Sequence, residues 1–382
     1  MAEDRFNPRA GEAVRLDPVG PPLSLVPNPL PPELSIDAPL LALLERANHA
    51  LGQLDAISSL LPNPEHLLYT FVRMEAVLSS RIEGTQSSLA DLLAYEQRQA
   101  VSVDTLDVRE VSNYVRALTE GVAQVKSGAA LDTKLIESLH AVLLQDTRGS
   151  DQLPGQLRTR QNWIGGDRPE AAVFVPPPAQ YLPKALDALW AFVELPADQS
   201  PYLVRTALTH YQFETLHPFL DGNGRLGRLL VTLQLCRYRL LQEPLLLLSL
   251  YFKRNRLEYY TRLQRVRTHG EWEEWVSFFS TAVQHTAVEA YELAQAIVRL
   301  FDQDREAVRT GATASVSAVL VVLQQKIYLS PTQACIATGL SFPQVSQALK
   351  KLEQIGIAKE TTGYKRNRVY CYRRYLEMVS IE

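Results

Sequence analysis

The chain has 382 residues, of which 46% are hydrophobic and 21% charged, and its formal net charge is −3. This is the composition of a globular protein with room for about two or three domains, and the small net charge argues against nucleic-acid binding over the whole surface. No apolar run is long enough to span a bilayer, no signal core follows the first residues, and the three cysteines are too scattered for a disulfide framework, so a cytoplasmic protein without membrane contact is expected.

The first predicted segment is an extended arm over residues 1–39. Prolines crowd this segment between residues 18 and 39. Proline fixes φ and removes a hydrogen-bond donor, so neither a helix nor an inner strand is expected there. From residue 40 to residue 105 the apolar side chains recur at helical spacing, which predicts an N-terminal helical lobe with a break between two helices at Pro62 and Pro64.

The largest predicted unit covers residues 106–307 and is again mainly helical. Its helical pattern is interrupted at residues 158–175, where two short β-prone runs surround a Gly-Gly-Asp turn. Helices are expected again at residues 182–193, 202–216 and 225–238. The predicted fold class is therefore an all-α helical bundle with one small β-hairpin.

The last predicted unit covers residues 313–382 and follows small residues at 310–312 that suit a linker. Three helices are predicted there, at 315–326, 331–338 and 343–355, and two β-prone runs follow. This order predicts a winged helix-turn-helix. Basic residues outnumber acidic ones in the unit, so DNA is one conceivable partner. The expected recognition helix has no arginine to read guanine edges, and winged helices also serve as protein-docking and dimer modules, so both alternatives remain.

One short segment, from His217 to Arg228, lies between two of the predicted helices and concentrates chemically useful residues. Gly222 and Gly224 let the backbone turn tightly and come close to a phosphate. The helix that follows directs its free N–H groups and the positive end of its dipole to the same place. The segment therefore predicts an anion site at the start of this helix.

The charged side chains of the segment fit the same interpretation. Arg225 and Arg228 are three residues apart on the first helical turn and can engage neighbouring phosphates. Asp221 supplies a hard oxygen ligand for a phosphate-bridging Mg²⁺. His217 lies at the entrance of the loop, where a neutral imidazole can accept a hydroxyl proton near pH 7.

This segment resembles the Fic family signature, H-P-F-x-[DE]-G-N-G-R-x-x-R, and matches it at every specified position. The resemblance implies a protein adenylyltransferase, which transfers AMP from Mg²⁺-bound ATP to a Ser, Thr or Tyr hydroxyl of a target protein or of itself. It implies a base at His217, a Mg²⁺ ligand at Asp221 and a core anchor at Phe219. The implied contacts to ATP and its phosphates are Gly222, Asn223, Gly224, Arg225 and Arg228. Fic kinases carry lysine at the place of Gly224, so AMP transfer is favoured here.

The similarity extends over about residues 40–301 and includes a flap. In Fic proteins a hairpin flap hydrogen-bonds the target backbone as an added strand. The residues at that place in this chain are Asn162, Trp163, Ile164, Val173 and Phe174. Simple packing of a small hairpin is the alternative interpretation for these side chains.

A second segment, Ser79 to Gly84, resembles the Fic inhibitory signature [ST]-x-x-x-E-[GN]. The resemblance implies that Glu83 holds Arg228 and takes the place of the γ-phosphate of ATP, with Ser79 one turn back to steady Glu83. The alternative is a solvated glutamate before a helix-terminal glycine.

Two alternatives to the adenylyltransferase remain from the sequence. In some relatives the same glutamate serves removal of AMP, so a de-AMPylating or bifunctional enzyme is one alternative, and a DNA-binding regulator that uses the fold as a nucleotide sensor is another. The intact His217 favours the enzyme. ATP and an unknown target protein are the implied partners, and a homodimer is a further alternative.

Overall fold

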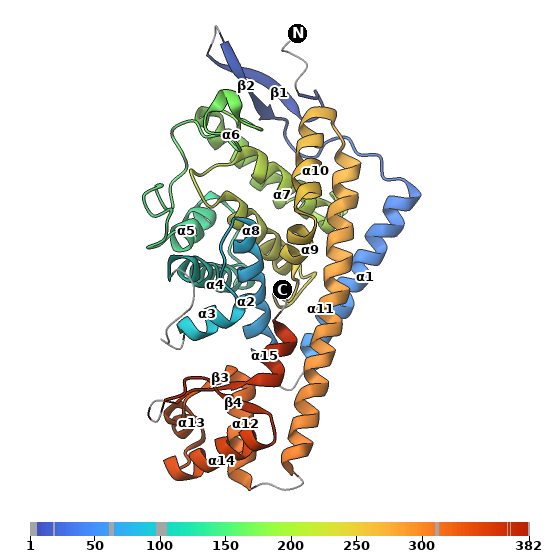
Figure 1. Ribbon diagram of the computed structural model, residues 1–382. Coiled ribbons are helices and arrows are strands. Elements are labelled where there is room, and N and C mark those ends of the chain that lie inside the picture. Colours follow the sequence, from blue (N-terminus) through green and yellow to red (C-terminus); the bar gives the residue numbers. More distant parts are fainter. Residues whose placement is uncertain are drawn as a thin grey trace.

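The computed structural model describes residues 6–17, 20–60, 65–96, 105–309, 313–364, 366 and 368–380 (Figure 1). The predicted helix break at Pro62 and Pro64 and the predicted linker at 310–312 lie outside these residues. The body is mainly helical, as the sequence predicted. Its helices are α1 (Ala38–Leu60), α2 (Glu65–Ile82), α3 (Leu89–Glu96), α4 (Thr105–Lys126), α5 (Thr133–Leu143), α6 (Leu182–Val193), α7 (Tyr202–Leu216), α8 (Asn223–Arg237), α9 (Leu248–Arg254), α10 (Arg256–His269) and α11 (Trp272–Arg309).

Helices α7 and α8 form the centre of the body. Every residue of α7 from Leu203 to Leu216 is buried, and nearly all of α8 is buried as well. A helix buried around its whole circumference must be enclosed by other elements. Here α2, α4, α9 and α11 lie around the pair, and α1 runs along the long helix α11 at the outer side (Figure 1). The loop between α7 and α8 is therefore held on a rigid base.

The N-terminal segment differs from the extended arm that the sequence predicted. Strands β1 (Gly11–Asp17) and β2 (Gly20–Pro27) pair antiparallel and form a two-stranded sheet. Both strands of such a sheet are edges, so the missing N–H donors of Pro21 and Pro22 disrupt little, and the register shifts opposite them, between Arg15 and Asp17. Proline density alone was therefore a poor guide here.

The hairpin predicted within residues 158–175 is reduced to one bridge. Ile164 and Phe174 pair antiparallel, and the chain returns through Gly165 and Gly166, whose φ angles are 71° and 77°. A short 3₁₀ turn at Pro169–Ala171 follows. The backbone leaves the pairing on either side of this single bridge, so no regular strands form here. Phe174 instead packs with Phe6 and the β1–β2 sheet in a small apolar cluster.

Among its described residues, the C-terminal unit contains four helices and a small sheet. Its elements are α12 (Ala314–Lys326), β3 (Tyr328–Leu329), α13 (Pro331–Thr338), α14 (Phe342–Gln354), β4 (Ala358–Glu360), β5 (Tyr370–Tyr372) and α15 (Arg373–Val379). The strands pair antiparallel in the order β3-β5-β4. Capping boxes at Ser330 and Ser341 start α13 and α14, as expected for Ser followed three residues later by Gln. Strand β3 and helix α15 were not predicted from the sequence.

Helix α15 joins the C-terminal unit to the body. The Tyr375 hydroxyl donates to Thr70 Oγ1 of α2 at 2.6 Å. Asp304 of α11 is fully buried and accepts from the Tyr372 hydroxyl and from Arg374 Nη1, both at 2.6 Å. The unit is therefore attached to two helices of the body. Across the part of the chain that the structure describes, no helix is long and apolar enough to cross a membrane.

Candidate active site

The loop between α7 and α8 has the backbone shape that its sequence predicted. His217 ends α7 in the left-handed region, with φ 45° and ψ 59°, and its N–H still donates to Phe213 O at 2.9 Å. Gly222 also has a positive φ, 76°, and α8 begins directly after it at Asn223. Two left-handed residues in six thus direct the free N–H groups of the first turn of α8 toward the mouth of the loop.

Two side chains of the loop turn inward and fix its shape. Asn223 Oδ1 accepts from Phe219 N and Asn223 Nδ2 donates to Phe219 O, each at 2.9 Å. Phe219 is fully buried, in agreement with its expected anchoring role. Asn223 was expected to contact the phosphates of ATP, and its side chain is not the group that can do so here. It is instead buried and used inside the loop, which leaves its backbone N–H for an anion.

Gly224 lies where no side chain fits. A Cβ atom built there would collide with Glu83 Oε1 and come within 3.1 Å of Arg228 Nη1. The glycine therefore serves close approach, as predicted, but the group that approaches in this structure is the carboxylate of Glu83.

His217 carries a neutral imidazole at physiological pH. Burial lowers the pKa of its ring to about 3, and the nearby guanidinium groups of Arg267 and Arg158 act in the same direction. Nδ1 is buried, so Nε2 is the atom left to meet a substrate. A ring that is unprotonated above pH 5 can accept a proton, although its low pKa makes it a weak base.

Arg158, which the sequence did not single out, supports the end of α7. Its side chain donates to His217 O at 2.9 Å, to Leu216 O at 3.2 Å and to Pro177 O at 2.6 Å. Since α7 ends at Leu216, these carbonyls have no partner within the helix. Arg158 lies far from them in sequence, so only the tertiary structure reveals this contact.

The five predicted flap residues divide into two groups. Asn162 is buried and donates to Phe219 O at 2.9 Å and to His217 O at 3.2 Å, so it holds the loop. Phe174 is buried beneath the guanidinium of Arg267. The side chains of Trp163 and Val173 are 39% and 60% exposed. Ile164 is partly buried and less exposed than either of them. The exposed members can contact a target with their side chains, and the docking role of the flap, which would use its backbone, stays a prediction for all five residues.

Glu83 lies directly after the end of α2 and contacts Arg228, as the sequence predicted. Glu83 Oε1 and Arg228 Nη2 are 2.6 Å apart. Burial would raise the pKa of Glu83, but the adjacent Arg228 outweighs it and lowers that pKa. Burial likewise would lower the pKa of Arg228, and Glu83 outweighs it. Both groups are therefore charged at neutral pH, and the Arg228 guanidinium is occupied by the Glu83 carboxylate.

Ser79 has a different partner from the one predicted. Arg228 Nε donates to Ser79 Oγ at 2.8 Å, and Arg228 Nη2 donates to Ser79 O at 3.0 Å. Ser79 therefore steadies Arg228 rather than Glu83. Ser79 lies one helical turn before Glu83. The Arg228 guanidinium is therefore held at two points at the C-terminal end of α2.

Arg225 is enclosed by carboxylates. Its Nη1 donates to Glu110 Oε2 of α4 at 3.1 Å, and its Nη2 lies 3.6 Å from Asp221 Oδ2. Arg148 binds the other oxygen of Glu110 at 2.7 Å. The Arg225 side chain is only 5% exposed and lies between two acids, and the phosphate contact expected of it stays a prediction. Nothing in the sequence pattern marked Glu110.

Asp221 is placed suitably for a divalent cation that a nucleotide brings with it. Its side chain is 44% exposed, and Oδ1 accepts from Gly222 N at 2.6 Å. Among the described residues no group of three or more His, Cys, Asp or Glu side chains could hold a metal ion. One carboxylate together with phosphate oxygens and water is a donor set that Mg²⁺ accepts, so the residues present fit Mg²⁺ bound with ATP and not a resident metal.

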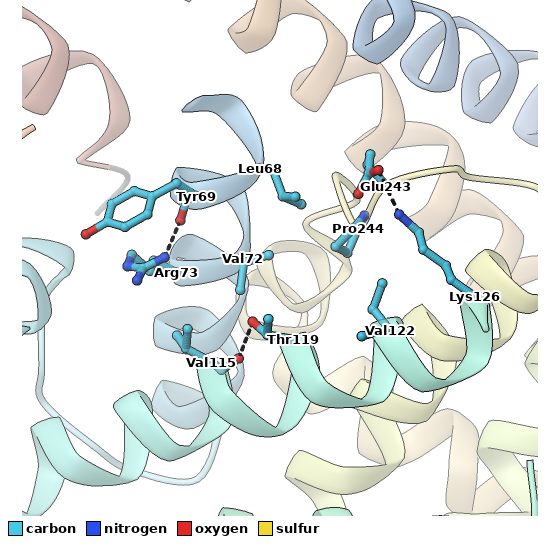
Figure 2. Close-up of a pocket in the computed structure, with 11 residues that line it drawn as sticks. Leu68, Tyr69, Val72, Arg73, Val115, Thr119, Val122, Lys126, Glu243 and Pro244 are labelled. Atoms are coloured by element: carbon cyan, nitrogen blue, oxygen red, sulfur yellow. Dashed lines mark hydrogen bonds and ion pairs between the residues drawn. The ribbon is translucent and has the colours of Figure 1, made fainter. Parts of the chain in front are cut away.

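A cavity of about 660 Å³ lies at the other end of α2, away from the loop (Figure 2). Apolar side chains from α2 and α4 line it, among them Val72 and Val122. The charged groups at its edge, Arg73 and Lys126, are paired with Glu96 and Glu243. This lining offers neither a base nor an anion cradle, so the chemistry remains with the α7–α8 loop.

Comparison with known proteins identifies the same regions. Residues 41–123 match the family described as Fic/DOC family N-terminal, and residues 130–235 match the Fic/DOC family. Protein adenylyltransferase Fic of Nematostella vectensis is 31% identical over 119 residues, which are 31% of this chain and 26% of that protein. Protein adenylyltransferase Fic of Drosophila grimshawi is 27% identical over 211 residues, 54% of this chain and 40% of that protein. This chain thus matches less than half the length of either relative.

Solved structures with the same fold cover more of the chain. The crystal structure of a Fic family protein from Desulfovibrio desulfuricans G20 has a TM-score of 0.57 at 22% identity, and covers 90% of this chain and 98% of its own. A Fic domain containing signaling protein from Bacteroides thetaiotaomicron has a TM-score of 0.53 at 18% identity, covering 65% of this chain and 95% of its own. At these identities the likeness establishes the fold.

Proposed function

Because the chain belongs to the Fic family, we propose that it is a protein adenylyltransferase that transfers AMP from Mg²⁺-bound ATP to a hydroxyl side chain of a protein, its own chain included. One observation carries the proposal: the neutral imidazole of His217 lies at the entrance of a loop whose far side is the N-terminus of α8. A base and an anion cradle six residues apart are what transfer of a nucleotidyl group to a hydroxyl requires.

In the proposed reaction His217 accepts the proton of the acceptor hydroxyl at Nε2. The hydroxyl oxygen forms a bond to the α-phosphorus of ATP, and the bond from that phosphorus to the bridging oxygen of the β-phosphate breaks. The N–H groups of Asn223 and Gly224 and the positive end of α8 stabilise the leaving pyrophosphate. Asp221 would hold Mg²⁺, which neutralises phosphate charge when it is bound.

We further propose that Glu83 inhibits this reaction. The contact between Glu83 and Arg228 removes the guanidinium from the γ-phosphate and places a negative charge where that phosphate would lie. ATP could then bind only in a pose unsuited to in-line attack. The contact supports an inhibitory role for α2, whatever the target protein and its acceptor residue are.

For the C-terminal unit we propose a winged helix that docks protein. Ile336 of α13 and Phe342 of α14 flank the turn between these helices and are 81% and 59% exposed. Exposed apolar side chains on the expected recognition helix and on the helix before it suit a protein partner better than DNA. A mobility-shift titration with duplex DNA at low salt tests this, because appreciable binding there would favour the DNA alternative.

The deciding experiment for the enzyme is label transfer from ATP to protein. Purified protein is incubated with Mg²⁺ and with ATP labelled either at the α- or at the γ-phosphate, in the wild type and in Glu83→Gly. Label from the α-phosphate is expected in the protein, more strongly in Glu83→Gly, and none from the γ-phosphate. Incorporation of the γ-label would indicate a kinase, and no incorporation of either label, with a cell extract present as target source, would contradict the proposal.

A further inference from the structure

We propose that His140 of α5 is a positioning residue of this site, which fixes the peptide group between Asp221 and Gly222 and so sets the place of the Asp221 carboxylate. The inference rests on the proposed adenylyl transfer and extends it to a residue outside the loop. His140 showed no ligand-like pairing in the sequence, 81 residues before Asp221.

The hydrogen bonds of His140 define its tautomer. Nε2 lies 3.0 Å from Asp221 O, and Nδ1 lies 2.9 Å from Gly155 N. A backbone N–H can only donate and a carbonyl oxygen can only accept. Nδ1 is therefore the acceptor, and Nε2 carries the proton and donates it to Asp221 O. The ring bridges two loops through one donor and one acceptor, and a residue with a different pattern of donors cannot replace it.

The ring also packs directly against the catalytic loop. It stacks on Phe219 with 3.8 Å between the ring centroids and 16° between the planes. A Cβ atom built on Gly222 would lie 3.5 Å from His140 Nε2. His140 is fully buried, and burial lowers its pKa to about 4. Because Nδ1 accepts from Gly155 N, the ring acts as a neutral donor, and its contacts hold two of the loop residues, Phe219 and Asp221.

The consequence falls on Asp221. Its backbone oxygen is held from α5 by His140, while its carboxylate is held by Gly222 N at 2.6 Å and lies 3.6 Å from Arg225 Nη2. Loss of the donor at Nε2 leaves the Asp221 peptide free to rotate, and the carboxylate moves with it. Groups that orient a metal ligand in this way change metal affinity or activity by about 10–100-fold when they are removed.

The test separates orientation from packing with two variants. His140→Phe keeps the ring and its stacking on Phe219 but removes both hydrogen bonds. His140→Gln loses the ring but keeps an amide that can donate to Asp221 O. Both are made in the Glu83→Gly background, and Leu135→Ala, a buried position elsewhere on α5, serves as the control for lost stability. Thermal melting establishes that each variant is folded.

Two readouts are measured, ATP binding by calorimetry with and without Mg²⁺, and the Mg²⁺ concentration that gives half-maximal AMP transfer. For His140→Phe we expect Mg²⁺-ATP binding to weaken by about tenfold or more, unchanged ATP binding without metal, and a higher Mg²⁺ requirement. His140→Gln is expected to recover part of the loss, and Leu135→Ala to change neither value. Unchanged Mg²⁺-ATP binding in His140→Phe, or an equal loss with and without metal, overturns the proposal.

The binding readout also distinguishes failure of this inference from failure of the proposed function. If no variant transfers AMP but Mg²⁺-ATP binding depends on His140, the adenylyl transfer is wrong and the positioning role remains. If transfer proceeds and its Mg²⁺ dependence ignores His140, only the positioning role is wrong. Should His140→Phe not fold, His140→Gln decides, because retained Mg²⁺-dependent binding supports the role of the donor and a tenfold loss refutes it.

Discussion

His217 and His140 are both kept neutral by burial, yet their surroundings direct them to different tasks. His217 has Nε2 left for a substrate hydroxyl, whereas both ring nitrogens of His140 are taken up by backbone groups. A histidine whose two nitrogens are satisfied inside the protein cannot shuttle protons, but it can hold a backbone in place. Residue type alone therefore did not identify the role of either ring.

The clearest prediction at this scale concerns the base. His217→Ala, made in the Glu83→Gly background, should abolish AMP transfer and leave the affinity for ATP nearly unchanged, because the imidazole acts on the acceptor hydroxyl and not on the phosphates. Transfer of α-label and equilibrium ATP binding are measured side by side. Turnover that persists in the folded variant removes the proposed mechanism.

A second prediction concerns Glu75 of α2, which is buried. Its carboxylate accepts hydrogen bonds from the hydroxyl and from the backbone N–H of Ser249. Burial raises the pKa of Glu75 from 4.5 to about 7, and the Ser249 hydrogen bonds and Arg228 only partly oppose it. The unfolded chain therefore loses this proton near pH 4.5 and the folded protein near pH 7. The stabilisation of the fold that comes from the raised pKa of Glu75 is therefore fully present below pH 4.5. It is lost as the pH rises through 7.

Glu75→Gln removes this titration. The free energy of unfolding of the variant, relative to the wild type, should rise by about 2–3 kcal/mol between pH 5 and pH 8. Denaturant unfolding at the two pH values measures the difference, and Glu214, whose pKa burial also raises to about 7, cancels because both proteins contain it. Parallel pH profiles of the two proteins would show that Glu75 is ionised in the fold.

At the scale of elements, the C-terminal end of α2 places two residues against Arg228: Ser79 within the helix and Glu83 directly after it. Glu83→Gly should free the guanidinium and raise auto-adenylylation well above the wild-type level, and adding Arg228→Ala should cancel the gain because the released partner is then missing. Since Glu83 is about one third exposed, its loss should cost only about 1 kcal/mol of stability. Label incorporation and thermal melting are measured for both variants.

The single variant supplies its own negative outcome. If Glu83→Gly folds normally and labels no better than the wild type, Glu83 is only the residue after a helix end. Ser79→Ala is the matched comparison, because Ser79 binds Arg228 without occupying the γ-phosphate position. It should loosen Arg228 and raise labelling much less.

The elements most easily predicted are those whose signals are contiguous in sequence. Helices α6, α7 and α13 begin and end where the sequence analysis placed them. The His217–Arg228 segment was recognisable for the same reason, since Gly222 has a backbone role and Gly224 allows a close approach. The missed features depend on distant partners: Glu110 is paired with Arg225 across 115 residues, and Arg158 with His217 across 59. Side chains of this kind carry no local pattern.

The N-terminal hairpin was missed for a different physical reason. Prolines usually exclude inner strands, and residues 11–17 and 20–27 form a sheet that consists only of edges. Its stability comes from Leu23 and Leu25, which pack with Phe6 and with Phe174 of a segment about 150 residues later. A pattern of prolines could not reveal that cover.

At the scale of the whole molecule, the C-terminal unit is connected to the helix that carries Glu83. Tyr375→Phe removes the hydroxyl that donates to Thr70 of α2 and should cost about 1 kcal/mol of stability. Because α2 then has one contact fewer to hold it, auto-adenylylation should rise modestly, by less than in Glu83→Gly. Melting temperature and label incorporation are the measurements.

Tyr372→Phe is the control for this coupling. Its hydroxyl donates to Asp304 of α11 and not to α2, so the variant should lose comparable stability without gaining activity. Equal labelling by the two tyrosine variants would mean that α15 only supports the fold and does not restrain the position of α2.

The contact between Glu83 and Arg228 joins residues 145 positions apart, and Glu83, the proposed inhibitor, comes first in the chain. Proteins are synthesised from the N-terminus, and segments that emerge early fold early. Glu83 and α2 are therefore already made when the ribosome adds the His217–Arg228 loop. A nascent chain of this protein meets cellular ATP with the proposed inhibitor present before the catalytic loop is complete, so no stage of its synthesis exposes a finished loop that lacks Glu83.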